Sequence, residues 1–227
     1  MKGGIFARGY FLKKIHKLSY TDYIVSIGAA TLINLAVAGI FGILLLIFIF
    51  LRSRVFNIYL FLFFSAITIV FFILAKLPKP KKTTEKKNNL LIKKLYDFLS
   101  SWNVLSGNKK AIYELSILML LNFIIYALRI EYGFHILFKD VPLANCLIIS
   151  ILGVLTNIFA VTPAALGIKE FVVGTTYRLM NGNMVDAIVV ATVDRAISMI
   201  LVFILGLISC YVLLKKHNEY ISNARNK

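Results

Sequence analysis

An uninterrupted apolar run near the amino end constrains this chain more than any other feature. Residues 23–51 carry no charged side chain. At about 1.5 Å per residue, a helix of that length exceeds the roughly 30 Å hydrocarbon thickness of a bilayer. A secretory signal peptide is the alternative because basic residues precede the run, but its apolar part would be only about 7–15 residues long. Since 59% of the 227 residues are hydrophobic, we expect an integral membrane protein rather than a soluble domain.

Further apolar runs predict an all-α fold, a polytopic transmembrane helix bundle of five to six spans. We treat residues 1–227 as one integral membrane domain. The third run ends before Arg129 and Glu131, which we place in an outer loop. The predicted spans are residues 23–51, 55–75, 111–128, 141–161 and 185–214.

Positive charge is concentrated outside the apolar runs. Lys and Arg together number 26 against 10 for Asp and Glu, and eight lysines lie between Lys76 and Lys94. By the positive-inside rule, the loop over residues 76–110 and the amino terminus are cytoplasmic, which predicts a multi-pass protein of the inner or plasma membrane. Apolar positions recur at helical spacing over residues 91–105 and predict an interfacial amphipathic helix that favours anionic head groups. A solvated loop that only sets the topology explains the lysines equally well.

Residues 162–183 are unlike the other apolar segments. They contain a proline, several glycines and an adjacent Lys169 and Glu170, so we expect a broken or re-entrant segment rather than a lipid-facing helix. Such segments commonly line a binding site in transporters. If this one enters and returns on the same side, five spans put the carboxyl end outside; if it crosses, the carboxyl end is inside.

Ionisable residues within apolar segments are the candidates for a site. Each costs about 2.5–3.5 kcal/mol at the centre of a membrane helix, so these residues should face the bundle interior and pair. One hypothesis is a structural ion pair between Glu170 and Arg195. The other adds an anionic ligand, bound by the planar guanidinium of Arg195 and by free N–H groups of a helix that starts after Gly167. The candidates are Pro163, Gly167, Lys169, Glu170, Asp194 and Arg195, with Arg8 and Arg129 as weaker ones.

Enzyme chemistry has little support in the sequence. No GxSxG, HExxH, Walker A or CxxC motif is present, and the three histidines are scattered, so we expect no catalytic residue, metal or cofactor. The expected partner is a membrane phospholipid with an anionic head group, not a nucleic acid. We interpret Asp186 as a helix-start or interface charge, and we expect Asn34 to hydrogen-bond a neighbouring helix.

The pattern around the broken segment resembles a known family signature. Pro163, the run from Gly167 to Glu170, then Arg195 and Gly206 resemble the PGGLGxxE…R…G signature of the lysylphosphatidylglycerol synthase transmembrane family. That family includes the membrane part of the multiple peptide resistance factor and stand-alone flippase-like proteins. The chain differs from the signature in two places: Ala164 and Ala165 replace the glycine pair, and Lys169 replaces the more common Val-Arg pattern before the glutamate. The opening is also similar to an internal family segment, through Arg8, Tyr10, Leu12 and Lys13.

This resemblance implies a lipid-handling membrane domain. Family members usually have two further spans before the segment that opens this chain, so we expect a late start, a truncated product or a shorter variant. Members that make lysylphosphatidylglycerol also carry a soluble aminoacyltransferase domain. The first hypothesis is therefore binding, and flipping, of a phospholipid or lipid-linked head group. The alternatives are a phosphatidylglycerol lysyltransferase or its membrane subunit, acting in lipid metabolism and cationic peptide resistance with a separate soluble partner, and a non-transporting scaffold; a homo-oligomer fits any of these.

Overall fold

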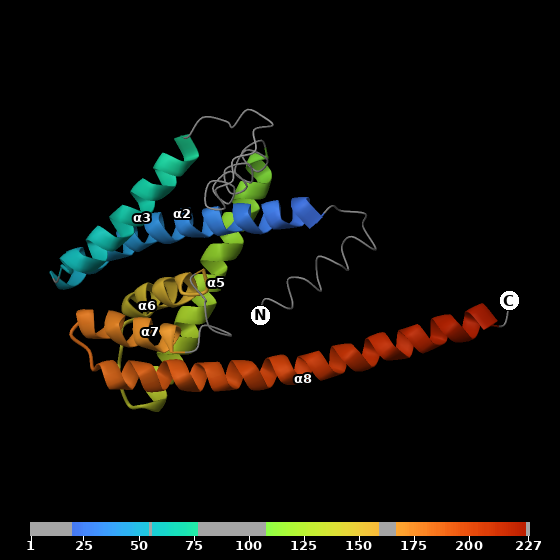
Figure 1. Cartoon of the computed structure of the whole chain (residues 1–227). Helices are drawn as coiled ribbons and strands as arrows, with labels where there is room; N and C mark the ends of the chain where they lie inside the picture. Colours follow the sequence, from blue (N-terminus) through green and yellow to red (C-terminus); the bar gives the residue numbers. More distant parts are fainter. Residues whose placement is uncertain (1–19, 55, 77–107, 159–166, 226–227) are drawn as a thin grey trace.

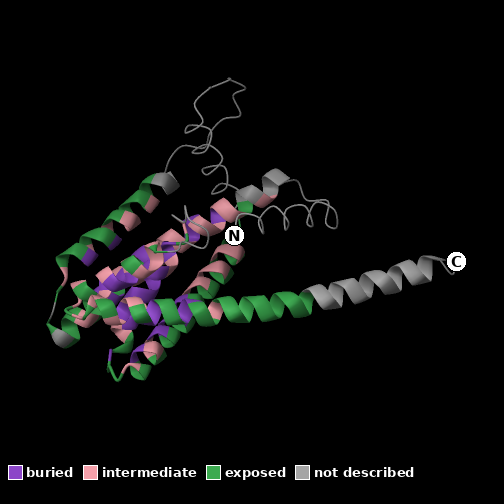
Figure 2. Cartoon of the chain, turned by 60° about the horizontal axis from the view of Figure 1, so that its bottom comes forward, coloured by how far each residue is buried: buried purple, intermediate pink, exposed green. Residues whose placement is uncertain are grey.

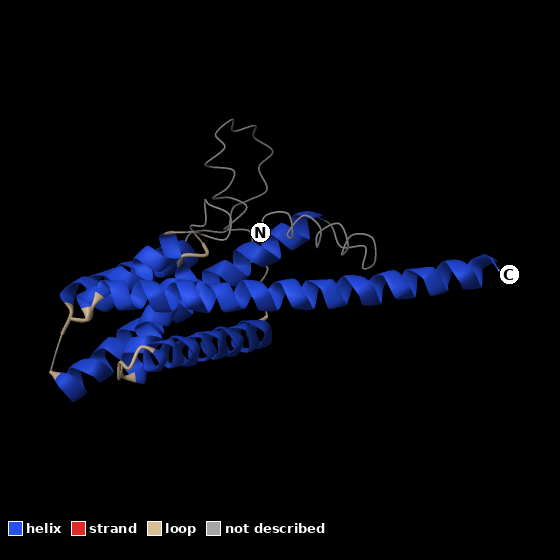
Figure 3. Cartoon of the chain, turned by 90° about the horizontal axis from the view of Figure 1, so that it is seen from below, coloured by secondary structure: helices blue, strands red, loops and turns tan. Residues whose placement is uncertain are grey.

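The computed structural model describes residues 20–54, 56–76, 108–158 and 167–225. Within these ranges the chain forms six α-helices and no strand, as Figures 1 and 3 show. The expected all-α class is confirmed. The helices are α2 (Tyr20–Ser53), α3 (Ile58–Lys76), α5 (Lys109–Ile136), α6 (Leu143–Leu155), α7 (Ile168–Leu179) and α8 (Met184–Arg225).

Three of these helices are long and apolar enough to cross a membrane. The qualifying stretches are Ser26–Arg52 in α2, Lys109–Ile136 in α5 and Met184–Ser209 in α8. Two further helices are apolar but shorter, over Ile58–Ile73 in α3 and Leu143–Leu155 in α6. These lengths and compositions are those of a helical membrane bundle.

Close packing at glycine joins α2 to α3 as an antiparallel pair. A Cβ added at Gly39 would lie 2.4 Å from Thr68 Oγ1, and one added at Gly42 would lie 2.5 Å from the Phe64 ring. Real Cβ atoms do not approach neighbours so closely, so both positions need glycine for the helices to touch. The order of these contacts shows that α3 runs back alongside α2 (Figure 1).

The two shortest helices, α6 and α7, also pack antiparallel to each other. A Cβ added at Gly153 would contact Val173, while Leu143 at the start of α6 and Leu179 at the end of α7 line the same cavity. With 13 and 12 residues, these helices are about 20 and 18 Å long. They form a hairpin, referred to below as the α6–α7 hairpin, and neither arm alone is as long as a membrane is thick.

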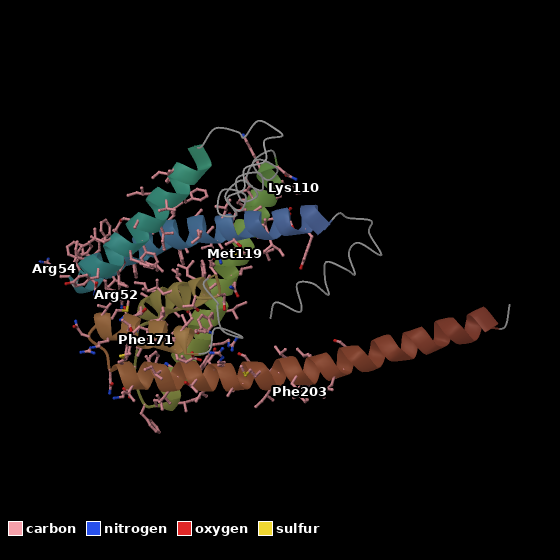
Figure 4. All side chains as sticks on the ribbon, in the orientation of Figure 1. Arg52, Arg54, Lys110, Met119, Phe171 and Phe203 are labelled. Atoms are coloured by element: carbon pink, nitrogen blue, oxygen red, sulfur yellow. The ribbon has the colours of Figure 1, made fainter. Side chains whose placement is uncertain are left out.

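Two clusters of buried side chains hold the bundle together. One joins α5, α6, α7 and α8 around residues such as Ile130, Ile149 and Ala191; the other joins α2, α3, α5 and α6 around Phe64 and Phe123. Figure 2 shows the buried residues gathered where these helices meet, while α8 continues beyond them with exposed side chains. Figure 4 shows Phe203 on this projecting part, among apolar residues at 196–208 that a soluble protein would not expose.

Several predicted boundaries are wrong. Helix α5 continues through Arg129 and Glu131 to Ile136, because Arg129 finds a partner on α8 and no outer loop is needed to solvate it. Helix α6 ends at Leu155, so the fourth predicted span is shorter than residues 141–161. The predicted interfacial helix, most of the basic loop, Arg8 and Pro163 lie outside the described residues.

The direction of α7 bears on the two alternatives for the carboxyl end. Because α7 returns to the end of the bundle where α6 begins, α8 starts there too and runs antiparallel to α5. Contacts of Gly133 with Val190 and of Arg129 with Asp194 show this direction. Helix α8 therefore leads toward the end where α2 and α5 begin. This is the carboxyl-end position of the second alternative, although α7 reaches it by returning alongside α6 and not as a separate crossing segment.

Candidate functional site

The site begins at the amino end of α7, where backbone geometry depends on a glycine. Gly167 has φ 82° and ψ −37°, a left-handed conformation that L-residues other than glycine rarely adopt. Its N–H donates to Glu170 Oε2 at 2.9 Å. The carboxylate thus caps its own helix, in the position where a bound anion was expected.

The other oxygen of the same carboxylate binds α8. Arg195 Nη1 donates to Glu170 Oε1, and the two side chains are only 10% and 13% exposed. This is the ion pair of the structural hypothesis. A charge-assisted hydrogen bond at such burial ties the start of α7 to the middle of α8.

Next to Arg195 on α8, Asp194 binds α5. Its Oδ1 lies 2.5 Å from Arg129 Nη2, and its side chain is 6% exposed. Arg129 also donates to Ser198 Oγ and, at 3.3 Å, to the Asp194 carbonyl oxygen. A second ion pair therefore connects α5 and α8.

Lys169 is held more loosely than the two arginines. Its Nζ lies 3.8 Å from Asp194 Oδ2, beyond hydrogen-bond distance, and 4.3 Å from the centre of the Tyr126 ring. Among the described residues, neither Asp194 Oδ2 nor the buried Tyr126 hydroxyl has a hydrogen-bond partner. Buried polar atoms are normally paired, so these two mark a place where a polar group is missing.

These side chains form the charge cluster: Arg129, Lys169, Glu170, Asp194 and Arg195. It holds three cations and two carboxylates, a formal excess of one positive charge. Four of the five side chains are at least four-fifths buried, whereas Arg129 is 44% exposed. The cluster is thus closed on most sides and accessible at Arg129, with capacity for one more negative group.

Position along the hairpin places the cluster away from the bundle ends. Lys169 and Glu170 belong to the first turn of α7, whereas Leu179 lies at the end of the bundle that holds the α2–α3 turn. About 13 Å of helix separates these two levels. The charged groups therefore lie well inside the bundle.

The structure brings together most of the predicted candidates. Lys169, Glu170, Asp194 and Arg195 converge, and Gly167 begins the helix that carries two of them. Arg129, which we ranked lower, contacts Asp194 directly. Elsewhere, Asp186 lies in the first turn of α8 and pairs with Lys139 at 3.5 Å. Among the described residues, no group of three or more His, Cys, Asp or Glu could hold a metal.

Sequence reasoning missed two members of the site. Tyr126 lies one helical turn before Arg129, and Ser198 one turn after Asp194, so helical spacing from each charge was the available signal. Asn34 was expected to hydrogen-bond another helix. Its buried Oδ1 has no partner within the described part of the chain, so for that atom no such bond is seen, and for the amide Nδ2 the expectation stays a prediction.

Comparison with known proteins supports the assignment suggested by the signature. The family model described as "Lysylphosphatidylglycerol synthase TM region" matches residues 1–206. No curated protein and no solved structure matches the chain. Because the family match covers far more than half of the sequence and the described helices are long and apolar, the chain belongs to the lysylphosphatidylglycerol synthase transmembrane-region family and is an integral membrane protein.

Proposed function

We propose that this protein binds the anionic head group of a phospholipid, or of a lipid-linked precursor, at the charge cluster and moves it between the two leaflets of the cell membrane. The single observation behind this is the excess of one cation in a buried cluster that also contains unpartnered polar atoms. A phosphate diester supplies the missing negative charge and a hydrogen-bond acceptor for the Tyr126 hydroxyl.

The proposal includes a membrane orientation. With the amino terminus and the basic loop cytoplasmic, α2 and α5 run outward, α3 and α8 run inward, and the α6–α7 hairpin enters from the outer side. The hairpin arms of about 20 and 18 Å then end near the bilayer midplane. This orientation puts Lys169 and Glu170 at a depth where a head group must pass to change leaflets.

Lys169 is the best candidate for the direct ligand contact. Arg195 already donates to Glu170, and Arg129 to Asp194. Among the residues that the structure describes, Lys169 has a long ion pair and the face of an aromatic ring as its partners. A phosphate oxygen near Lys169 Nζ would also be close to the Tyr126 hydroxyl, which can donate to it. The exposed part of Arg129 provides the approach.

Lipid that co-purifies with the protein tests this assignment. We expect Lys169→Gln to reduce the bound phosphatidylglycerol at least tenfold, because a charge-assisted contact to phosphate is lost. The measurement is mass spectrometry of lipids extracted from wild-type and variant protein, purified identically. The matched control is Lys139→Gln, which also removes a lysine paired with an aspartate, but at the end of the bundle. Equal lipid in Lys169→Gln and wild type would reject the proposal.

A scaffold role is the second candidate, and one observation favours it. The two close ion pairs join α5, α7 and α8, which is what a purely structural cluster would do. In that case Lys169→Gln would keep wild-type lipid content, while Arg195→Gln would lower the unfolding temperature. Aminoacyl transfer stays a prediction of the resemblance, tested by assaying this chain for aminoacylated lipid.

A further inference from the structure

A second hollow lies at the opposite end of the α6–α7 hairpin from the charge cluster. It is a cavity of about 770 Å³ between the end of α2, the start of α3, the start of α6 and the end of α7. None of the five charged residues of the cluster lines it. Its volume falls within the roughly 300–1,000 Å³ of typical ligand sites.

The lining of this cavity is amphipathic. Its walls are largely aliphatic, with Leu45, Leu60, Leu147 and Leu179 contributed by four different helices. Polar groups come from Asn145, Asn181 and Arg52. A ligand that fits must combine a hydrocarbon part with an acidic part, because the walls are aliphatic and Arg52 is a cation.

Arg52 supplies the charge complementarity. It is exposed in the last turn of α2, and no ion pair joins it to any residue that the structure describes. Figure 4 shows Arg52 on the side of the α2–α3 turn that faces α6 and α7, and Arg54 on the outer side of the same turn. Of these two arginines, Arg52 lines the cavity and Arg54 does not.

The cavity has fixed walls. Asn57 Oδ1 accepts hydrogen bonds from the N–H groups of Tyr59 and Leu60 at the start of α3, and its Nδ2 donates to the Leu179 carbonyl oxygen at the end of α7. One side chain thus joins the α2–α3 turn to the α6–α7 hairpin beside the cavity. The hollow is therefore a product of the fold and not a gap between independent parts.

We infer that this cavity is a second lipid site, in which Arg52 binds the phosphate of an anionic phospholipid and the aliphatic walls take part of its acyl chains. The inference rests on the membrane setting of the proposed function but not on lipid binding at the charge cluster. In the proposed orientation the site lies at the level of the outer leaflet, so it would hold lipid on that side of the protein.

Native mass spectrometry of the purified full chain, titrated with dioleoyl phosphatidylglycerol, tests the inference. Two bound lipids are expected for the wild type, and Arg52→Gln should weaken one of them about tenfold. Arg54→Gln is the matched control, with the same charge removed from the same turn, and should leave both affinities unchanged. Filling the cavity with Ala144→Phe should remove the same lipid that Arg52→Gln weakens.

Separate arms distinguish the ligand source and the two sites. Glycerol phosphate at the same concentration as the lipid should not displace phosphatidylglycerol, and phosphatidylcholine should bind more weakly than phosphatidylglycerol. Failure of either expectation overturns the assignment of an anionic lipid. Lys169→Gln should leave the Arg52-dependent lipid bound. If Arg52→Gln and Arg54→Gln bind phosphatidylglycerol equally, the second site is rejected, whatever the result for Lys169→Gln. If in that case Lys169→Gln alone loses a bound lipid, the proposed function still stands.

Discussion

Gly167 and Glu170 together set the position of the buried charges. The left-handed conformation of Gly167 starts α7 at that point, and Glu170 then reaches back to the Gly167 N–H and across to Arg195. Both residues were predicted as candidates, Gly167 because a helix starting after it would have free N–H groups, and Glu170 because it is ionisable within an apolar segment. The roles of Tyr126 and Ser198 were not predicted, because they depend on how α5 and α8 pack.

Substitution of Gly167 tests this local geometry. No atom of the described residues lies within 4 Å of a Cβ added there, so the strain expected in Gly167→Ala comes from the φ of 82°. We expect a destabilisation of about 1–2 kcal/mol. Thermal unfolding in one detergent gives the comparison, and a Gly167→Ala protein as stable as the wild type would contradict the account.

At the scale of helices, sequence and structure agree best where a segment is long. The runs over residues 23–51 and 185–214 fall inside α2 and α8, since one uncharged stretch is enough to predict a helix. The boundaries of α5 and α6 were wrong for opposite reasons. Arg129 continues inside α5 because Asp194 neutralises it, and α6 ends early although its next residues are still apolar. Neither the pairing of Arg129 with another helix nor the early end of α6 can be predicted from the residues of that helix alone.

The α6–α7 hairpin makes a prediction about access. Phe138 follows α5, and Asn181 follows α7; both are exposed and lie on the same end of the bundle, opposite to the exposed Asn108. In a background of Cys146→Ala and Cys210→Ala, single cysteines at 138 and 181 should react with an impermeant maleimide from outside intact cells. A cysteine at 108 should react only after the cells are opened. Reaction of 138 and 181 from opposite sides would mean that the hairpin crosses the membrane.

At the scale of the whole molecule, the pairing within the charge cluster and the short length of the hairpin together account for charged residues inside the bundle. Five charged side chains inside a membrane bundle are costly, and the pairing of Glu170 with Arg195 and of Asp194 with Arg129 offsets most of that cost. The short hairpin places them at the proposed midplane, and α8 continues past them into an apolar surface suited to lipid. From sequence alone the residues of the cluster could be named, but the excess of positive charge became clear only when Arg129 joined it.

Lipid movement in reconstituted vesicles tests the central claim most directly. Vesicles of phosphatidylcholine with fluorescent phosphatidylglycerol would carry wild-type protein, Lys169→Gln or the control Lys139→Gln, and dithionite would report the rate at which inner-leaflet label reaches the outside. We predict that wild type and Lys139→Gln accelerate this transfer, and that Lys169→Gln slows it at least tenfold toward the protein-free rate while remaining folded. Transfer by Lys169→Gln at the wild-type rate would contradict the account.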